Sequence, residues 1–147
     1  MPWGQDYLFK DRRDAGRQLA QALVRYRDAP QTIVLGLPRG GVVVAYEISL
    51  ALHLPLDVLV TRKLGTPGNP ELAMGALAET GYRYLNRDVL DSYDVPAREL
   101  EEEIGRQQRE IARRIERYRQ GRALPALAGD TVILVDDGIA TGATFYA

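Results

Sequence analysis

Residues 132–144 constrain the fold of this chain most strongly, because they join an apolar run to two acids and a loop of small residues. The run from Val132 to Val135 contains only β-branched residues and leucine, without alternation, which favours a short parallel strand buried on both faces. Asp136 and Asp137 then lie at the carboxyl end of that strand, where open α/β sheets bind ligands. The segment therefore predicts an α/β fold with a ligand site at this edge of the sheet.

The loop after the two acids is built mainly from small and hydroxyl-bearing residues, namely Gly138, Ile139, Ala140, Thr141, Gly142, Ala143 and Thr144. Small residues let backbone N–H groups close around an anion, and threonine hydroxyls add donors, so the loop is suited to a phosphate. Two adjacent carboxylates would repel that phosphate. Asp136 and Asp137 are therefore expected to face a sugar diol, a hydrated Mg²⁺ ion, or both.

The order of an apolar strand, Asp-Asp, two variable residues and Ala-Thr-Gly-Ala-Thr resembles the 5-phosphoribosyl-1-diphosphate (PRPP) motif of type I phosphoribosyltransferases. The resemblance implies that Asp136 and Asp137 hold the ribose hydroxyls and, through water, Mg²⁺. It also implies that residues 138–144 hold the 5′-phosphate, and that the fold is a three-layer α/β/α arrangement with a mainly parallel sheet.

An alternative family also has a hydrophobic strand that ends in acids, the P-loop nucleoside triphosphatases. The segment from Gly36 to Gly41 has the glycine spacing of a P-loop, but Val42 and Val43 stand where Lys and Ser or Thr must follow. The sequence therefore favours the phosphoribosyltransferase interpretation.

A second set of candidate residues is Arg39-Gly40-Gly41, which follows an apolar run predicted as a strand over residues 32–37. A diphosphate needs close backbone approach and a fixed positive charge, and these residues supply both. They resemble the diphosphate loop of the same family, which implies a cis peptide bond between Pro38 and Arg39. The sequences around residues 9–16 and 69–75 resemble a bacterial subgroup of uncharacterised phosphoribosyltransferases.

Further elements are predicted over most of the chain, which is expected to be one domain over residues 1–147. Helices are predicted over residues 13–27, 42–54 and 96–120, and a second core strand over residues 56–61. Arg62 and Lys63 would end that strand near Arg39, where the resemblance gives a basic residue a diphosphate contact; a surface pair is the equal alternative. Residues 65–85, rich in glycine and proline, are expected to form a mobile hood with a short hairpin around residues 79–81.

The predicted helix over residues 96–120 has one narrow apolar stripe and is charged elsewhere. Glu102 with Arg106 and Glu110 with Arg114 are spaced for ion pairs along the helix. The glutamates cancel most of the field of the arginines, so a solvated surface is favoured over an RNA-binding one.

The resemblance implies an enzyme of nucleotide metabolism, a phosphoribosyltransferase that uses PRPP and Mg²⁺ to transfer ribose 5-phosphate to a nitrogenous acceptor with release of diphosphate. Asp136, Asp137 and Arg39 would carry catalysis. The alternative is a PRPP-binding regulatory or sensor module without transferase activity. In hypoxanthine-guanine members an Asp usually serves the base where Ala140 stands, so a 6-oxopurine acceptor is disfavoured. Relatives continue beyond Thr144 through a helix and further strands, so the fold is expected to be incomplete at the C-terminus.

Composition narrows the partners of the chain. A net charge of −1 gives no overall attraction to nucleic acid or to an anionic membrane. No apolar run reaches the roughly 18 residues of a membrane span, and the N-terminus lacks the apolar core of a signal peptide. Cysteine is absent, which fits a reducing compartment. We therefore expect a cytoplasmic protein whose partners are small molecules and further copies of the chain in a homo-oligomer.

Overall fold

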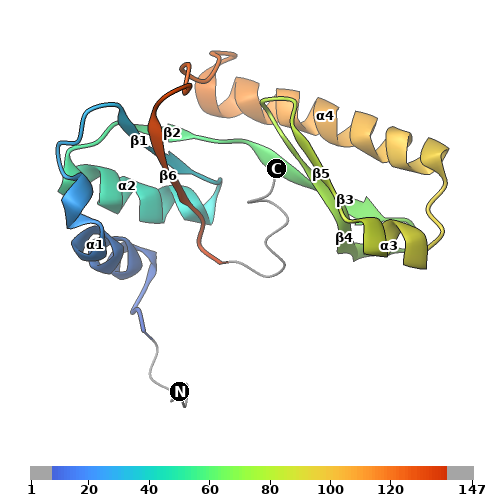
Figure 1. Ribbon diagram of the computed structural model, residues 1–147, viewed down its shortest axis with the longest axis horizontal. Helices are drawn as coiled ribbons and strands as arrows, with labels where there is room; N and C mark the ends of the chain where they lie inside the picture. The colour runs from blue at the N-terminus through green and yellow to red at the C-terminus, as the bar shows by residue number, and fades with distance from the viewer. Residues whose placement is uncertain (1–7, 139–147) are drawn as a thin grey trace. The chain divides into compact units, whose positions relative to one another are not determined.

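The structure, a computed structural model, describes residues 8–138, which divide into two compact units. Unit 1 comprises the described residues up to Val58 together with Leu124–Gly138, and unit 2 comprises Leu59–Ala123. The elements of unit 1 in Figure 1 are α1 (Arg12–Ala22), the 3₁₀ turn η1 (Val24–Tyr26), β1 (Thr32–Gly36), α2 (Gly40–Leu52), β2 (Leu56–Val58) and β6 (Thr131–Val135). Unit 2 contains β3 (Thr61–Thr66), β4 (Asn69–Ala78), β5 (Arg83–Leu85), α3 (Arg87–Ser92) and α4 (Ala97–Arg119).

The strands of unit 1 form one parallel sheet in the order β2-β1-β6 (Figure 1). The register pairs Thr32 with Thr131 and Gly36 with Val135, so β1 and β6 begin and end side by side. The predicted α/β class is confirmed, and the two strands that precede the candidate loops are parallel neighbours. Because both strands end at the same edge of the sheet, the segments that follow them are brought together.

The core of unit 1 lies between this sheet and α2, and α1 packs on α2. Val34, Ala45 and Ile48 are almost completely buried there. The predicted helix over residues 42–54 actually begins at Gly40, so both glycines of the candidate diphosphate loop belong to its first turn. The helix predicted over residues 13–27 ends at Ala22, because Leu23 leaves the helical backbone conformation and a 3₁₀ turn follows.

The sequence-based prediction was wrong about where the second core strand ends. Strand β2 stops at Val58, and Arg62 and Lys63 lie inside β3, which belongs to the antiparallel sheet β3-β4-β5 of unit 2. Residues 56–61 are mostly apolar throughout, so the sequence carries no local signal for the point where the chain leaves one sheet and enters the other. These two basic residues therefore do not end a strand of the parallel sheet.

The glycine-rich stretch predicted as a mobile hood with a short hairpin contains a ten-residue strand, β4, which is longer than that hairpin requires. Gly75 within β4 serves close packing, since a Cβ there would meet the carbonyl oxygen of Tyr84 at 2.3 Å, whereas Gly68 and Gly81 have positive φ angles of 78° and 91°. The predicted hairpin around residues 79–81 is confirmed, since β4 and β5 pair antiparallel on either side of it. Mobility of this region stays a prediction.

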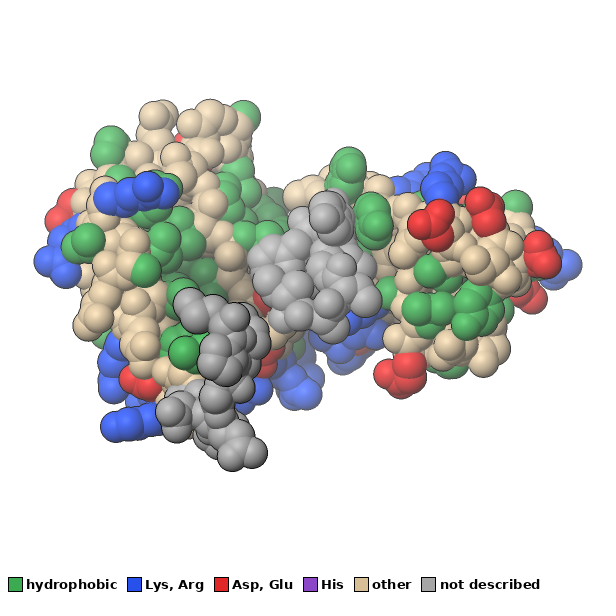
Figure 2. Space-filling view, turned by 60° about the horizontal axis from the view of Figure 1, so that its bottom comes forward, with side chains coloured by type: hydrophobic (Ala, Val, Ile, Leu, Met, Phe, Trp, Pro, Cys, Tyr) green, Lys and Arg blue, Asp and Glu red, His purple; other side chains and the backbone are tan. Residues whose placement is uncertain are grey.

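The long helix α4 confirms the prediction over residues 96–120 and packs on β3 and β4. Its predicted apolar stripe is confirmed as well, with Ile104 and Ile111 buried and the other members packed against the same cluster. Of the two expected ion pairs, Glu110 with Arg114 forms, whereas Glu102 pairs with Arg98 instead of Arg106. Figure 2 shows both basic and acidic side chains on the visible face of unit 2, in line with a solvated mixed-charge surface.

Unit 2 is also held by an ion pair in its interior. The side chains of Glu79 and Arg119 are 5% and 3% exposed and are directly hydrogen-bonded, and Glu79 also accepts the backbone N–H of Val60 at 2.8 Å. Among residues 8–138, none of the helices combines the length and the hydropathy that crossing a bilayer requires.

Candidate functional site

The candidate site of unit 1 is formed by the two segments that leave β1 and β6 at the same edge of the sheet. The backbone N–H of Leu37 donates to the carbonyl oxygen of Val135 at 2.9 Å, which extends the pairing of β1 and β6 by one residue. Pro38, Arg39 and α2 then follow β1, while Asp136, Asp137 and Gly138 follow β6. The peptide bond between Pro38 and Arg39 is cis, which confirms the expectation drawn from the resemblance.

The two glycines that begin α2 lie directly against the acid pair. A Cβ on Gly41 would meet the carbonyl oxygen of Val135 at 2.7 Å and Cα of Asp136 at 2.9 Å. A Cβ on Gly40 would meet Oδ2 of Asp137 at 1.9 Å. A side chain at either position would collide with the acid pair, so glycine is needed here for the packing of the protein itself. The approach of a diphosphate to Gly40 and Gly41, which the sequence analysis expected, stays a prediction.

Arg39 stands immediately before α2 as its N-cap residue, and its side chain is exposed. Within residues 8–138 it takes part in no ion pair. The adjoining first turn of α2 carries backbone N–H groups without partners in the helix and the positive end of the helix dipole. Arg39 and this helix terminus together form a positively polarised surface beside the acids.

The acid pair has a defined local geometry. The backbone N–H of Asp137 donates to Oδ1 of Asp136 at 2.8 Å, which orders the turn after β6. Asp136 is half-buried, and the side chain of Asp137 is 33% exposed. Both carboxylates therefore stay within reach of a ligand at the edge of the sheet. Their residues follow directly after Val135, the last residue of β6.

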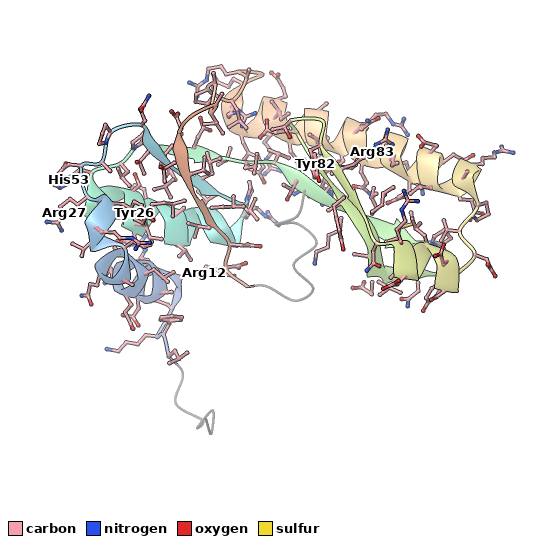
Figure 3. All side chains as sticks on the ribbon, in the orientation of Figure 1. Arg12, Tyr26, Arg27, His53, Tyr82 and Arg83 are labelled. Atoms are coloured by element: carbon pink, nitrogen blue, oxygen red, sulfur yellow. The ribbon has the colours of Figure 1, made fainter. Side chains whose placement is uncertain are left out.

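Arg12 is a member of this cluster that the sequence-based analysis did not assign. Its Nε and Nη2 donate to Oδ2 of Asp137 at 3.0 and 2.8 Å, and Figure 3 shows it reaching from the start of α1 towards the end of β6. The hydrogen bonds from the Arg12 guanidinium hold the pKa of Asp137 below its ordinary value, against the opposing effect of partial burial. In the sequence analysis, only the resemblance of residues 9–16 to a bacterial subgroup of phosphoribosyltransferases pointed to this segment. That resemblance assigned no role to any residue.

Comparison with known proteins decides the family. The sequence matches the family described as "Phosphoribosyl transferase domain" over residues 6–147. This chain belongs to that family. Two Mycobacterium tuberculosis proteins named "Putative phosphoribosyl transferase", Rv0571c of strain H37Rv and MT0597 of strain CDC 1551, are each 53% identical over 140 residues, or 95% of this chain.

A solved structure agrees with the family assignment. The crystal structure of TT1426 from Thermus thermophilus is 46% identical in sequence, has a TM-score of 0.70, and covers 95% of this chain. The predicted phosphoribosyltransferase-like α/β fold is therefore confirmed. The chain spans 31% of the length of the two curated relatives and 65% of the solved chain, so it matches one part of those proteins.

The other predicted site residues of this phosphoribosyl transferase domain divide into three groups. Gly138 lies at the end of the described chain, and among the described residues, its chain neighbour aside, none has an atom within 4 Å of the position of an added Cβ. The rest of the predicted 5′-phosphate loop lies outside the described residues, namely Ile139, Ala140, Thr141, Gly142, Ala143 and Thr144. Arg62 and Lys63 lie in β3 of unit 2, where Nε of Arg62 donates to Oε1 of Gln107 at 2.9 Å; their diphosphate contact stays a prediction.

The donor set of the acid pair fits the Mg²⁺ that the phosphoribosyltransferase resemblance implies. Asp136 and Asp137 offer carboxylate oxygens, the ligand type that Mg²⁺ prefers. Within residues 8–138 there is no group of three or more His, Cys, Asp or Glu side chains that could hold a metal ion alone. One or two carboxylates are usual where Mg²⁺ keeps several waters and arrives with a phosphate ligand. The two carboxylates therefore suit a hydrated Mg²⁺ ion, and whether the protein uses Mg²⁺ stays a prediction.

Proposed function

We propose that the unit-1 site binds PRPP together with Mg²⁺ and that the protein transfers ribose 5-phosphate to a nitrogenous acceptor. The observation that carries this proposal is the parallel register of β1 and β6, which brings Arg39-Gly40-Gly41 and Asp136-Asp137 to one edge of the sheet. A ligand with a diphosphate at one carbon and a diol on the neighbouring carbons needs cationic and anionic groups side by side. The family match makes such a ligand the first choice.

In this proposal the diphosphate lies at the start of α2. Its oxygens would accept hydrogen bonds from the free backbone N–H groups of the first turn, and the exposed Arg39 guanidinium would balance its charge. Gly40 and Gly41 add no side chains of their own beside the acid pair, which packs directly against them. The residues thus stabilise the charge that builds up on the leaving diphosphate, with no rearrangement needed during the reaction.

The ribose diol lies at the end of β6, where Asp136 and Asp137 accept hydrogen bonds from its hydroxyls. The same carboxylates would hold the waters of a bound Mg²⁺, which supplies positive charge to the leaving diphosphate. The loop 138–144 takes the 5′-phosphate, on the strength of the family resemblance. With both ends of the ligand fixed, the anomeric carbon is held at a defined distance from the acceptor.

The reaction breaks the bond between the anomeric carbon and the diphosphate oxygen, and diphosphate keeps the electron pair. A nitrogen of the acceptor forms the new bond to the same carbon and then loses its proton to solvent. No group of the protein becomes covalently attached. The contribution of the chain is therefore positioning and charge stabilisation.

The proposal is tested first by calorimetric titration of PRPP into the protein, with and without Mg²⁺. Binding is expected only with Mg²⁺, and the Asp136→Asn, Asp137→Asn double variant is expected to weaken it about a hundredfold, since hydrogen bonds to charged groups are involved. Asp130→Asn is the matched control, because Asp130 precedes β6 at the opposite end of the strand. Equal binding by the double variant and this control would contradict the proposed site.

A second measurement separates transfer from binding alone. Release of diphosphate is followed with PRPP, Mg²⁺ and a panel of nitrogenous bases. The transferase proposal expects release with at least one base. Tight binding with no release for any base would instead support a PRPP-binding regulatory module.

A further inference from the structure

The contact between Arg12 and Asp137 joins residues 125 positions apart in the sequence. Both donors of Arg12 reach the same acceptor atom, Oδ2, at 3.0 and 2.8 Å. That oxygen is also the atom that packs against Gly40, and a Cβ on Gly40 would meet Nε of Arg12 at 2.8 Å. Arg12 therefore lies where the acid pair and the start of α2 meet, and its guanidinium engages one of the two carboxylate oxygens of Asp137.

The start of α1 is built so that Arg12 takes a fixed place. Asp11 is the N-cap, and its Oδ1 accepts the backbone N–H of Asp14 at 2.8 Å. Asp14 reaches back in turn, accepting the backbone N–H of Lys10 at 2.9 Å. This reciprocal arrangement fixes the first turn in the manner of a capping box. Because Arg12 is the first residue of the helix, this cap also fixes the position and direction of its backbone.

A second device sets the distance between α1 and α2. Gly16 lies one turn after Arg12, and a Cβ there would meet Cβ of Glu47 at 2.6 Å and the carbonyl oxygen of Val44 at 2.7 Å. Only glycine allows the two helices to approach this closely. Arg17 adds an ion pair with Glu47 at 3.6 Å. Because α2 also carries Gly40, this crossing places the start of α1 relative to the site.

The positive charge of Arg12 reduces the repulsion between the acid pair and an anionic ligand. Two adjacent carboxylates repel the phosphate groups of a ligand. The cation at Oδ2 offsets one of these negative charges through hydrogen bonds to a single carboxylate oxygen of Asp137. A ligand that carries both a diol and phosphates can then use the acids as hydrogen-bond acceptors while meeting less repulsion.

We propose that Arg12 is a positioning residue of the site: it holds Asp137 in one orientation against Gly40 and offsets its charge, so that an anionic sugar ligand can bind beside it. The inference rests on the proposed function for the identity of that ligand. In this role Arg12, at the start of α1, acts on Asp137. It does not need to contact the ligand directly.

The test is a double-mutant cycle on Mg²⁺-PRPP affinity, measured by calorimetry. Arg12→Gln is expected to weaken binding about tenfold in the wild-type background and to have little further effect when Asp137 is already Asn. Arg12→Lys keeps the charge and is expected to recover part of the affinity. Arg13→Gln is the matched control, with the same charge change on the next residue, which has no ion pair within residues 8–138.

A ligand-free measurement accompanies the cycle. The Nε–H resonance of Arg12 in ¹⁵N–¹H spectra is expected to move in Asp137→Asn and to stay in place in Asp130→Asn. Thermal unfolding of Arg12→Gln should shift by less than about 3 °C, because the pair is largely exposed. A purely structural Arg12 would instead lower the unfolding temperature and leave the affinity cycle additive.

The outcomes separate the inference from the proposed function. Absence of PRPP binding by the wild-type chain would contradict the proposed function, and the Nε–H resonance would then decide by itself whether Arg12 holds Asp137. Wild-type binding with an unchanged Arg12→Gln affinity would overturn the positioning role. So would an equal loss in the Asp137→Asn background, since Arg12 would then act on the ligand directly.

Discussion

Alanine substitution of the two glycines at the start of α2 should separate the fold from the site. A Cβ at position 41 would meet backbone atoms, the carbonyl oxygen of Val135 at 2.7 Å and Cα of Asp136 at 2.9 Å. A Cβ at position 40 would meet ends of side chains, Oδ2 of Asp137 at 1.9 Å and Nε of Arg12 at 2.8 Å. Backbone at the end of a sheet cannot move without disturbing the pairing of strands, whereas exposed side chains can turn away.

The expected magnitudes follow from this difference. Overpacking against immovable atoms costs about 1 to 3 kcal/mol, and replacing glycine by alanine in a helix returns at most about 1 kcal/mol. Gly41→Ala is therefore expected to lose about 1 to 2 kcal/mol of unfolding free energy. Gly40→Ala should stay within about 1 kcal/mol of the wild type, because its steric conflict is relieved by moving two side chains. That movement displaces Asp137, so Gly40→Ala should weaken Mg²⁺-PRPP binding about tenfold or more.

Urea unfolding and calorimetric titration of both variants measure these effects. Gly105→Ala in α4 is the control for the helix term, because the nearest atom to its Cβ, Nη1 of Arg109, lies at an ordinary 3.5 Å. The unfolding free energy of this control variant should rise by up to about 1 kcal/mol. The reasoning would be refuted if Gly41→Ala were as stable as Gly40→Ala, or if Gly40→Ala bound PRPP as tightly as the wild type.

Two further predictions concern the charges of unit 2. Glu79→Gln removes the carboxylate charge that Arg119 contacts in the interior of unit 2 and should cost about 3 kcal/mol in urea unfolding, whereas Glu102→Gln, which breaks an exposed pair, should cost less than about 1 kcal/mol; equal costs would contradict this assignment. Hydrogen bonds from Arg113 and Arg114 lower the pKa of Glu110 from 4.5 to about 2. Its contribution to stability should therefore be complete above pH 4.5 and be lost as the pH falls towards 2. Carboxyl NMR should show a midpoint near the lower value in the folded protein, and a midpoint at the ordinary value would show that the pair does not persist in solution.

The sequence alone predicted those elements whose pattern is local. The uninterrupted apolar run before Asp136 predicted a parallel strand, and the structure has β6 there as a parallel partner of β1. The predicted burial on both faces was wrong for this strand within the described residues: β6 is the outer strand of the sheet, and Val132 is exposed while Val135 is buried. The apolar stripe of α4 repeats at the helical period over its whole length, and the helix extends from Ala97 to Arg119. Local patterns of this kind are reliable because burial acts on the same residues that form the element.

The glycine-rich stretch after β3 shows where composition misled. Glycine and proline indicate irregular backbone when read one position at a time. At Gly75, however, glycine is present because the neighbouring strand β5 comes too close for a side chain, with the carbonyl oxygen of Tyr84 at 2.3 Å from an added Cβ. The same residue type thus serves either flexibility or tight packing, and only the partner strand distinguishes the two.

The candidate site divides in the same way. The residue types of Arg39, Gly40, Asp136 and Asp137 indicated phosphate and diol chemistry, and a resemblance read from the sequence named the family. The hydrogen bonds from Arg12 to Asp137 could not be predicted from the sequence, since no local pattern joins residues 125 positions apart. It depends on the helix cap at Asp11 and on the close crossing of α1 over α2, so it exists only once those helices have packed.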